Sequence, residues 1–211
     1  DDYILEHIDA EPEFLHTLDR DTHLYHLRPR MCSGHLQGRI LKMLVRMIRP
    51  RRILELGTFT GYSALCLAEG MPESSELHTI EIDDELEDFI RSHFDSSEFA
   101  DRLHLHIGDA KEILASMGDV KFDLVFMDAN KREYCEYYDL VFPMLEEGGF
   151  IIADNTLWDG HVVDESHLKD AQTQGIVRFN KMVAMDDRVE KVILPIRDGL
   201  TLIRKRPKCE L

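Results

Sequence analysis

The stretch "ILELGTFTGYSAL", residues 53–65, decides how this chain folds. It begins as an apolar run of the kind that forms a strand, carries Glu55 within that run, and continues through Gly57 and Gly61 into an apolar segment. A chain that leaves a strand and enters a helix at once must turn tightly, and glycine permits such a turn. The stretch therefore predicts a strand–loop–helix unit.

Similar units follow along the chain. Several of the expected strands are apolar on both faces, which is typical of parallel strands covered by helices. Repeated strand–helix units of this length predict an α/β fold with a doubly wound, mostly parallel sheet. The expected strands span residues 51–56, 76–82, 102–107, 122–128 and 148–154, and the expected helices lie near 61–70, 83–95, 109–117 and 131–146.

The two ends of the chain differ from this pattern. Residues 3–48 are expected to be helical, and residues 188–205 to form an antiparallel hairpin around Asp198 and Gly199. One domain is expected over residues 1–211, with a helical N-terminal cover at 1–48 and the sheet at 51–205. An apolar helical stripe is expected to consist of Leu36, Ile40, Leu41, Leu44, Met47 and Ile48.

Charge, hydropathy and cysteines limit the possible functions. A net charge of −16 disfavours nonspecific nucleic-acid binding, which requires an excess of Lys and Arg. No apolar run reaches the roughly 18 residues of a membrane helix, so no membrane partner is expected. The cysteines, at positions 32, 66, 135 and 209, form no C-x-x-C pair, which favours reduced thiols in a cytoplasmic protein.

The glycine loop and the next two strand ends indicate a ligand without phosphates. No Lys follows Gly61, and the G-x-G-x-x-G pattern of dinucleotide sites is absent. Glu55 would repel a phosphate and suits a cationic group. Glu81 can accept hydrogen bonds from a ribose diol, and Asp109 with Ala110 can border an adenine ring. Together these features describe S-adenosylmethionine; the alternative is that Glu55 and Glu81 are ordinary exposed acids.

Oxygen ligands follow two later strands. Asp128 ends the expected strand 122–128, and Asp154 with Asn155 ends the strand at 148–154. If these strands are neighbours, two carboxylates and an amide oxygen meet at one edge of the sheet. Such a set suits Mg²⁺, or alternatively Mn²⁺ or Ca²⁺, rather than zinc. The alternative is that Asp154 and Asn155 only cap a turn.

Six motifs in order make the sequence recognisable. It resembles the cation-dependent class I O-methyltransferases, the family of the caffeoyl-coenzyme A and catechol O-methyltransferases, in its bacterial form. The resemblance covers residues 28–205. The motifs are "RPRMCSGHLQGRIL" (28–41), "ILELGTFTGYSAL" (53–65), "TIEID" (79–83), "VFMDANKREY" (125–134), "GGFIIADNTLWDG" (148–160) and "LPIRDGLTLIRK" (194–205).

The resemblance implies roles for particular residues. The divalent metal would be bound by Asp128, Asp154 and Asn155, with Asp128 also near the methyl donor. Lys131 matches the general base of the catechol enzymes, whereas Asn130 replaces an acid that the plant enzymes usually carry. The cofactor would be held by Met31, Glu55, Gly57, Ser63, Glu81 and Ala110, and the acceptor substrate would be contacted by Trp158 and Asp159.

The predicted function is an S-adenosylmethionine-dependent, divalent-metal-dependent O-methyltransferase. Its acceptor is expected to be a small catechol-like molecule with vicinal oxygens, free or carried on a larger ester. The resemblance also suggests a homodimer, for which the apolar N-terminal helices offer a surface.

Three alternatives stay open. In the first, the acceptor is a hydroxylated uridine of tRNA; the charge of −16 weighs against it, although residues 28–30 and 203–208 are locally basic. In the second, the chain is a cofactor-binding module without activity, which Lys131 and the oxygen ligands disfavour. The third is a nicotinamide oxidoreductase, against which the missing G-x-G-x-x-G pattern counts.

One histidine pattern lies outside these motifs. The sequence "HLH" places His104 and His106 two residues apart in the expected strand 102–107. Side chains alternate between the faces of a strand, so both rings are expected on one partly buried face.

Overall fold

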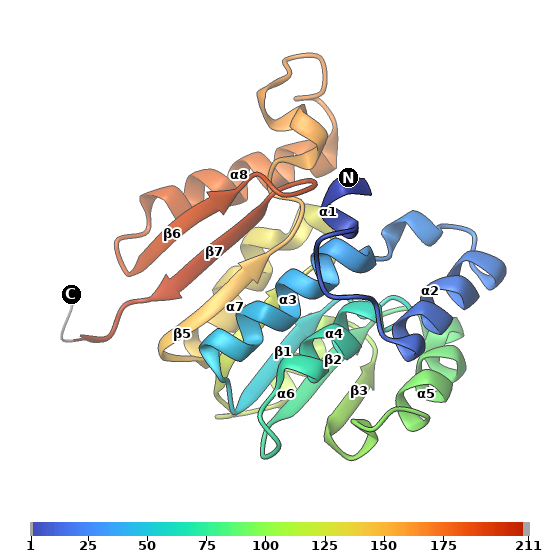
Figure 1. Ribbon diagram of the computed structural model, residues 1–211. Coiled ribbons are helices and arrows are strands. Elements are labelled where there is room, and N and C mark those ends of the chain that lie inside the picture. The colour runs from blue at the N-terminus through green and yellow to red at the C-terminus, as the bar shows by residue number, and fades with distance from the viewer. Residues whose placement is uncertain (1, 209–211) are drawn as a thin grey trace. The chain divides into compact units, whose positions relative to one another are not determined.

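The computed structural model describes residues 2–208 (Figure 1). The chain divides into two compact units. Unit 1 contains the residues up to Arg51 together with Thr58–Asp109, and unit 2 contains Arg52–Gly57 together with the chain from Ala110 onward. The expectation of a single domain over residues 1–211 stays a prediction, and Cys209 lies outside the described residues.

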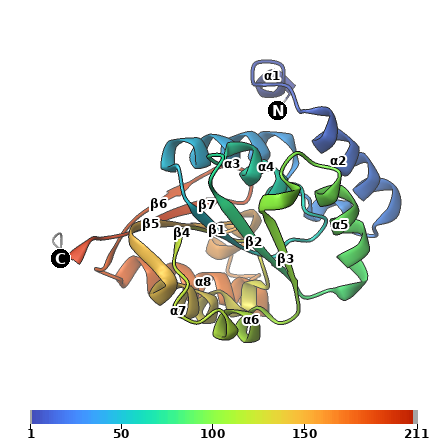
Figure 2. The ribbon, with the colours of Figure 1, turned by 90° about the horizontal axis from the view of Figure 1, so that it is seen from below.

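Unit 1 combines helices with two parallel strands, β2 and β3. Helices α3 and α4 pack side by side, because Gly38 lets them approach: a Cβ there would lie 2.6 Å from the Sγ of Cys66 (Figure 2). The elements are α1 (Asp2–Leu5), α2 (Glu13–Tyr25), η1 (Pro29–Met31), α3 (Gly34–Ile48), α4 (Tyr62–Gly70), β2 (Glu76–Glu81), η2 (Asp84–Leu86), α5 (Glu87–Asp95), η3 (Ala100–Arg102) and β3 (Leu103–Ile107).

The predicted apolar stripe of α3 is wrong in part. Met47 is 72% exposed, whereas Gln37, Leu41 and Val45 are buried. These buried residues lie four positions apart and therefore share one face of the helix. The close contact at Gly38 directs that face toward α4. A prediction from the spacing of apolar residues alone does not detect this contact.

Unit 2 holds the remaining strands and helices. Helices α6, α7 and α8 lie on the same face of its strands (Figure 2). The expected helix 131–146 is a short 3₁₀ turn followed by α7, which ends at Met144 because β5 begins earlier than expected. The elements are β1 (Arg52–Leu56), α6 (Ala110–Ser116), β4 (Phe122–Met127), η4 (Lys131–Glu133), α7 (Tyr134–Met144), β5 (Leu145–Ala153), η5 (Trp158–Val163), α8 (Ala171–Met185), β6 (Val189–Leu194) and β7 (Leu200–Lys205).

The strands follow the order β3-β2-β1-β4-β5-β7-β6. The pairs β1–β4, β2–β3 and β4–β5 are parallel, and β7 pairs antiparallel with both β5 and β6. The predicted fold class is thereby confirmed, including the C-terminal hairpin. The strand order reverses between β1 and β4, and ligands of such sheets bind outside the carboxyl ends of the strands at this point.

Between residues 2 and 208, no helix is both long enough and apolar enough to cross a membrane.

Candidate active site

Two acidic residues lie side by side where β4 and β5 end. Met127 is paired with Ala153 in the parallel register, so Asp128 and Asp154 are the next residues on neighbouring strands. The amide of Asp154 donates to the carbonyl of Met127 at 3.0 Å, which fixes this arrangement. Asp154 is 3% exposed, and burying a carboxylate is costly unless charged or polar groups surround it.

Lys131 supplies the positive charge at this edge. It is 6% exposed, and its Nζ donates to Asp128 Oδ1 at 2.5 Å and to Tyr134 Oη at 2.9 Å. Asn130 begins the turn that carries Lys131, because its side-chain oxygen accepts from the amide of Arg132 at 3.3 Å. Asn130 therefore caps this turn.

Tyr134 joins the two strand ends and was missed by the sequence analysis. It is fully buried, and its Oη lies 3.0 Å from the carbonyl oxygens of both Met127 and Asp154. Burial raises the pKa of its hydroxyl, and the charges of Asp128 and Asp154 raise it further, so the hydroxyl stays protonated. The sequence signal that could have identified Tyr134 is its position three residues after Lys131, since residues three apart share a helical face.

The loop after β5 has an unusual backbone. Asn155, Trp158 and Asp159 have φ angles of 58°, 47° and 51°, which residues other than glycine rarely adopt. The hairpin turn supports this loop, because the carbonyl of Asp198 accepts from the amides of Leu157 at 2.7 Å and Trp158 at 3.2 Å. Strained loops of this kind gather at binding and catalytic sites.

Gly175 of α8 is a second residue that the sequence analysis missed. A Cβ at this position would lie 2.3 Å from the carbonyl oxygen of Lys131. Only glycine therefore allows α8 to pack directly against the turn that carries Lys131. An isolated glycine inside a helical pattern was the signal that could have found it.

Three of the predicted cofactor residues of unit 2 lie in β1, in the loop that follows it and at the start of α6. Glu55 is fully buried, and Ala110 is the first residue of α6. Gly57 has a φ of 96°, and a Cβ there would lie 2.4 Å from the carbonyl oxygen of Asp128. The glycine loop is therefore tightly apposed to the residue that follows β4.

The predicted cofactor residues of unit 1 include a second buried carboxylate. Glu81 is 7% exposed, and its oxygens accept from the amides of Phe59 at 2.6 Å and Asp83 at 3.0 Å. Burial raises the pKa of Glu81, while these backbone hydrogen bonds oppose the shift. The alternative that Glu55 and Glu81 are exposed acids is therefore wrong.

The other predicted residues occupy varied environments. Ser63 is buried in the first turn of α4, Asp109 is half-buried after β3, and Met31 is 54% exposed at the end of η1. In unit 2, Trp158 is half-buried and Asp159 is exposed.

The oxygen donors after β4 and β5 fit a hard divalent cation. Asp128 and Asp154 bring two carboxylates to neighbouring strand ends. Nδ2 of Asn155 is directed to Asp198 Oδ2 at 3.5 Å, which leaves the Asn155 side-chain oxygen for a cation. Carboxylate and amide oxygens are the ligands that Mg²⁺ and Ca²⁺ prefer.

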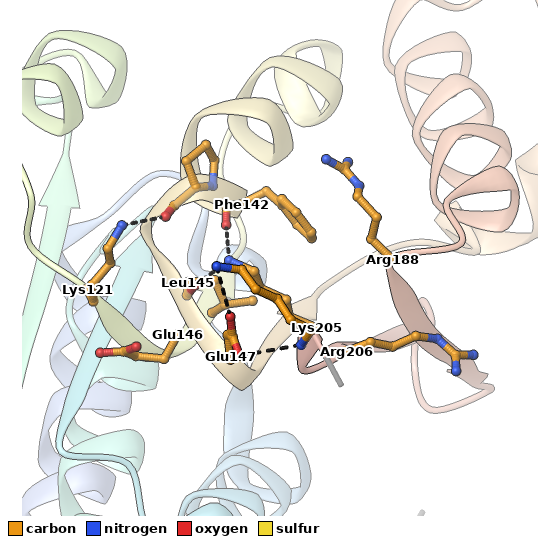
Figure 3. Close-up of a pocket in the computed structure, with 10 residues that line it drawn as sticks. Lys121, Phe142, Leu145, Glu146, Glu147, Arg188, Lys205 and Arg206 are labelled. Atoms are coloured by element: carbon orange, nitrogen blue, oxygen red, sulfur yellow. Dashed lines mark hydrogen bonds and ion pairs between the residues drawn. The ribbon is translucent and has the colours of Figure 1, made fainter. Parts of the chain in front are cut away.

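A cavity of about 330 Å³ lies at the other end of β5 and is unrelated to this arrangement (Figure 3). Nζ of Lys205 donates to the carbonyls of Phe142 at 3.1 Å and Leu145 at 2.6 Å. Nζ of Lys121 donates to the carbonyl of Pro143 at 2.8 Å. These lysines therefore satisfy the last carbonyls of α7, which a helix leaves without intrahelical partners.

Comparison with known proteins agrees with the arrangement at the strand ends. A family model described as O-methyltransferase matches residues 5–206. The chain is 34% identical over 182 residues to the catechol O-methyltransferase of Niastella koreensis, which covers 82% of each chain. It is 32% identical over 208 residues to caffeoyl-CoA O-methyltransferase 1 of Zea mays, which covers 92% of this chain and 79% of the relative.

Solved structures give the same result. The O-methyltransferase TomG of Streptomyces achromogenes, in complex with SAM, has a TM-score of 0.90 at 32% identity, over 98% of this chain and 96% of its own. The O-methyltransferase of Bacillus cereus, in complex with SAH, has a TM-score of 0.91 at 28% identity, with the same coverage. The prediction of an S-adenosylmethionine-dependent O-methyltransferase is thereby confirmed, and the chain belongs to the O-methyltransferase family.

Proposed function

We propose that this enzyme methylates one hydroxyl of a catechol-like acceptor with the help of a divalent cation. The observation that carries the proposal is the buried Lys131, whose Nζ lies 2.5 Å from Asp128 Oδ1 beside the oxygen donors of β5. The names of the relatives from Niastella koreensis and Zea mays support the acceptor class. They give no support to tRNA as the acceptor.

The proposed metal ligands are Asp128, Asp154 and Asn155. When bound, the cation would favour the oxyanion of the acceptor, and S-adenosylmethionine would supply the electrophilic methyl group. Of the three cations predicted, Mg²⁺ is proposed first because the donors are all hard oxygens.

The contacts of Lys131 suit a general base. Once the charged Lys131 has given up one proton, its amine has two N–H donors and one lone pair, and the contacts to Asp128 and Tyr134 use both donors. The lone pair is then available for the proton that leaves the acceptor hydroxyl. A base within hydrogen-bond reach of the reacting group typically accelerates a reaction by about 10²–10⁴-fold.

The binding roles of the other predicted residues are part of the proposal. Trp158 and Asp159 are proposed to contact the acceptor, because they lie three and four residues after the proposed metal ligand Asn155. The residues proposed to bind S-adenosylmethionine are Glu55, Gly57, Ala110 and Asp128 of unit 2, and Met31, Ser63, Glu81 and Asp109 of unit 1. The enzyme is further proposed to be a homodimer, which analytical ultracentrifugation at micromolar concentration would test.

Transfer of labelled methyl from S-adenosylmethionine to a panel of catechols tests the proposal, with Mg²⁺ and with EDTA. We expect EDTA and Asp154→Ala to abolish transfer while cofactor binding, measured by calorimetry, persists. Asp187→Ala, at an exposed position outside the site, serves as the matched control. Transfer that survives both EDTA and Asp154→Ala would remove the metal from the proposal. Cofactor binding without transfer to any catechol would favour an inactive module.

A further inference from the structure

Four polar side chains share one face of the β2–β3 pair, in unit 1. The parallel register pairs His78 with His104. Glu76 lies two residues before His78, and His106 lies two residues after His104, so alternation directs all four to the same side. The expectation that His104 and His106 share a partly buried face is confirmed.

Three of these side chains converge at ligand distances. His78 Nε2 lies 3.8 Å from Glu76 Oε1, and His104 Nε2 lies 3.5 Å from Glu76 Oε2. One ligand atom from each residue lies within 4.8 Å of the other two. Ligands of a tetrahedral zinc ion, at about 2.0–2.1 Å from the metal, are about 3.3 Å apart. Side-chain movements of up to about 1.5 Å would therefore bring the three ligand atoms to this spacing.

The fourth side chain orients the first histidine. His106 Nε2 lies 3.0 Å from His78 Nδ1, and the two rings are nearly parallel, with an interplanar angle of 14°. With Nδ1 engaged in this way, His78 directs Nε2 toward Glu76. Metal-binding histidines commonly hold their second ring nitrogen in such a hydrogen bond, which fixes the tautomer and the ring orientation.

The ligand types decide which class of ion suits this face. Two imidazole nitrogens and one carboxylate oxygen favour zinc and its neighbours in the first transition series over Mg²⁺ or Ca²⁺. The set is thus chemically different from the oxygen donors of Asp128, Asp154 and Asn155. Three protein ligands also leave a fourth position for water.

We propose that Glu76, His78 and His104 form a binding site for a zinc-like divalent ion, with His106 as the orienting residue. The ion would link β3, which lies at one edge of the strand order, to β2, because its ligands come from both strands. The site is independent of methyl transfer and of the proposed magnesium ligands.

Titration of the full chain with Zn²⁺ in saturating Mg²⁺ tests the proposal, with a chromogenic chelator as competitor. We expect one tightly bound ion in the wild type. His78→Ala or His104→Ala should weaken binding by more than about 100-fold, and His106→Gln by about 10–100-fold, as for other orienting residues. The wild-type melting temperature should rise with Zn²⁺, and the His78→Ala melting temperature should not.

A second histidine pair provides the control. His161 and His167 stack with ring centroids 3.8 Å apart, and His167 Nδ1 lies 2.9 Å from Asp164 Oδ2. The double variant His161→Ala/His167→Ala should bind Zn²⁺ like the wild type, and so should Asp154→Ala. Loss of binding in the double variant, with retention in His78→Ala, would overturn the proposal.

Spectroscopy on the wild type covers the case in which a histidine variant does not fold. Co²⁺ in place of Zn²⁺ should give the visible absorption of a low-symmetry, four-coordinate ion. Imidazole ¹⁵N resonances of His78 and His104 should shift on Zn²⁺ addition, while those of His161 and His167 stay in place. Shifts confined to His161 and His167, or an absence of any bound ion, would contradict the assignment.

Discussion

Two lysines at opposite ends of β4 and β5 serve different purposes. Lys131, at the carboxyl ends, contacts the Asp128 carboxylate and the Tyr134 hydroxyl. Lys205, at the amino end of β5, contacts the backbone carbonyls of Phe142 and Leu145, and lies 4.9 Å from the Phe142 ring centroid. Burial, reinforced by the charge of Lys121, lowers the pKa of Lys205.

The difference shows that a lysine withdrawn from solvent is not in itself a catalytic feature. Lys205 lines a cavity, yet its donors satisfy the end of a helix. Lys131 instead contacts two titratable groups, the carboxylate of Asp128 and the hydroxyl of Tyr134. The groups that each lysine contacts, rather than its burial or the size of a nearby cavity, therefore distinguish the candidate catalytic Lys131 from the structural Lys205.

The largest effect is expected from replacing Lys131. Lys131→Met removes the proposed base and should lower methyl transfer by about 10²–10⁴-fold, with cofactor binding retained. The measurement is the turnover of labelled methyl under saturating acceptor. Lys205→Met is the matched control and should leave turnover unchanged. An equal loss of turnover in Lys131→Met and Lys205→Met would contradict the catalytic role proposed for Lys131 alone.

Gly175→Ala tests whether the position of Lys131 depends on α8. The added methyl would meet the Lys131 carbonyl, so the free energy of unfolding should fall by about 1–3 kcal/mol. Turnover should fall as well, because the turn that carries Lys131 must move. Lys181→Ala, at an exposed position of the same helix, controls for the change to alanine. Full activity and stability in Gly175→Ala would contradict the close packing.

Tyr134→Phe tests how far Lys131 depends on its hydroxyl partner. It removes the hydroxyl that contacts Lys131 and the carbonyls of Met127 and Asp154, and should lower the free energy of unfolding by about 1–3 kcal/mol. Denaturant unfolding measures this loss, and kinetics should show a lower kcat with a displaced pH profile. An unchanged pH profile would assign Tyr134 to stability alone.

Lys205→Met has its own expected effect on the structural side. It should lower the free energy of unfolding by about 1 kcal/mol, because the last carbonyls of α7 lose a charged donor. Thermal unfolding of the variant and the wild type gives the comparison. Lys181→Met, at an exposed position of α8, is a suitable control. A variant as stable as the wild type would show that water replaces the lysine without cost.

The smallest effect concerns pH. Hydrogen bonds from Arg188 hold the pKa of Asp186 at about 2, below its usual 3.8, although burial opposes the shift. A depressed carboxyl pKa stabilises the fold above the unfolded pKa, so this contribution is lost as the pH falls from about 4 to 2. Acid unfolding of Asp186→Asn should therefore be less steep in this interval than that of the wild type. Identical acid profiles would show that the pair has no influence on stability.

Much of the fold was predictable from the sequence because the strands are short apolar runs that end in chemically distinctive residues. Asp128 and Asp154 were expected at strand ends that would meet if the two strands were neighbours, and β4 and β5 are neighbours. The hairpin around Asp198 and Gly199 was expected as a turn. Its support of the loop that follows Asn155 was not, because that contact joins segments far apart in the sequence.

Other features depend on packing that periodicity does not describe. The buried face of α3 is set by Gly38 against Cys66, and the position of Lys131 by Gly175 of a helix more than 40 residues later. Glycines of this kind permit close approach, and a single sequence does not show what approaches them. Glu76 and His78 likewise meet His104 only after β2 and β3 pair.

The strained loop after β5 also carries the chain's single tryptophan, Trp158. Its intrinsic fluorescence therefore originates from one indole, three residues after Asn155. Any change in emission that accompanies addition of a metal ion, a donor or an acceptor can be assigned to this loop without an introduced label. Trp158 fluorescence is therefore a natural probe of this loop. It can distinguish binding at the ends of β4 and β5 from binding elsewhere on the protein.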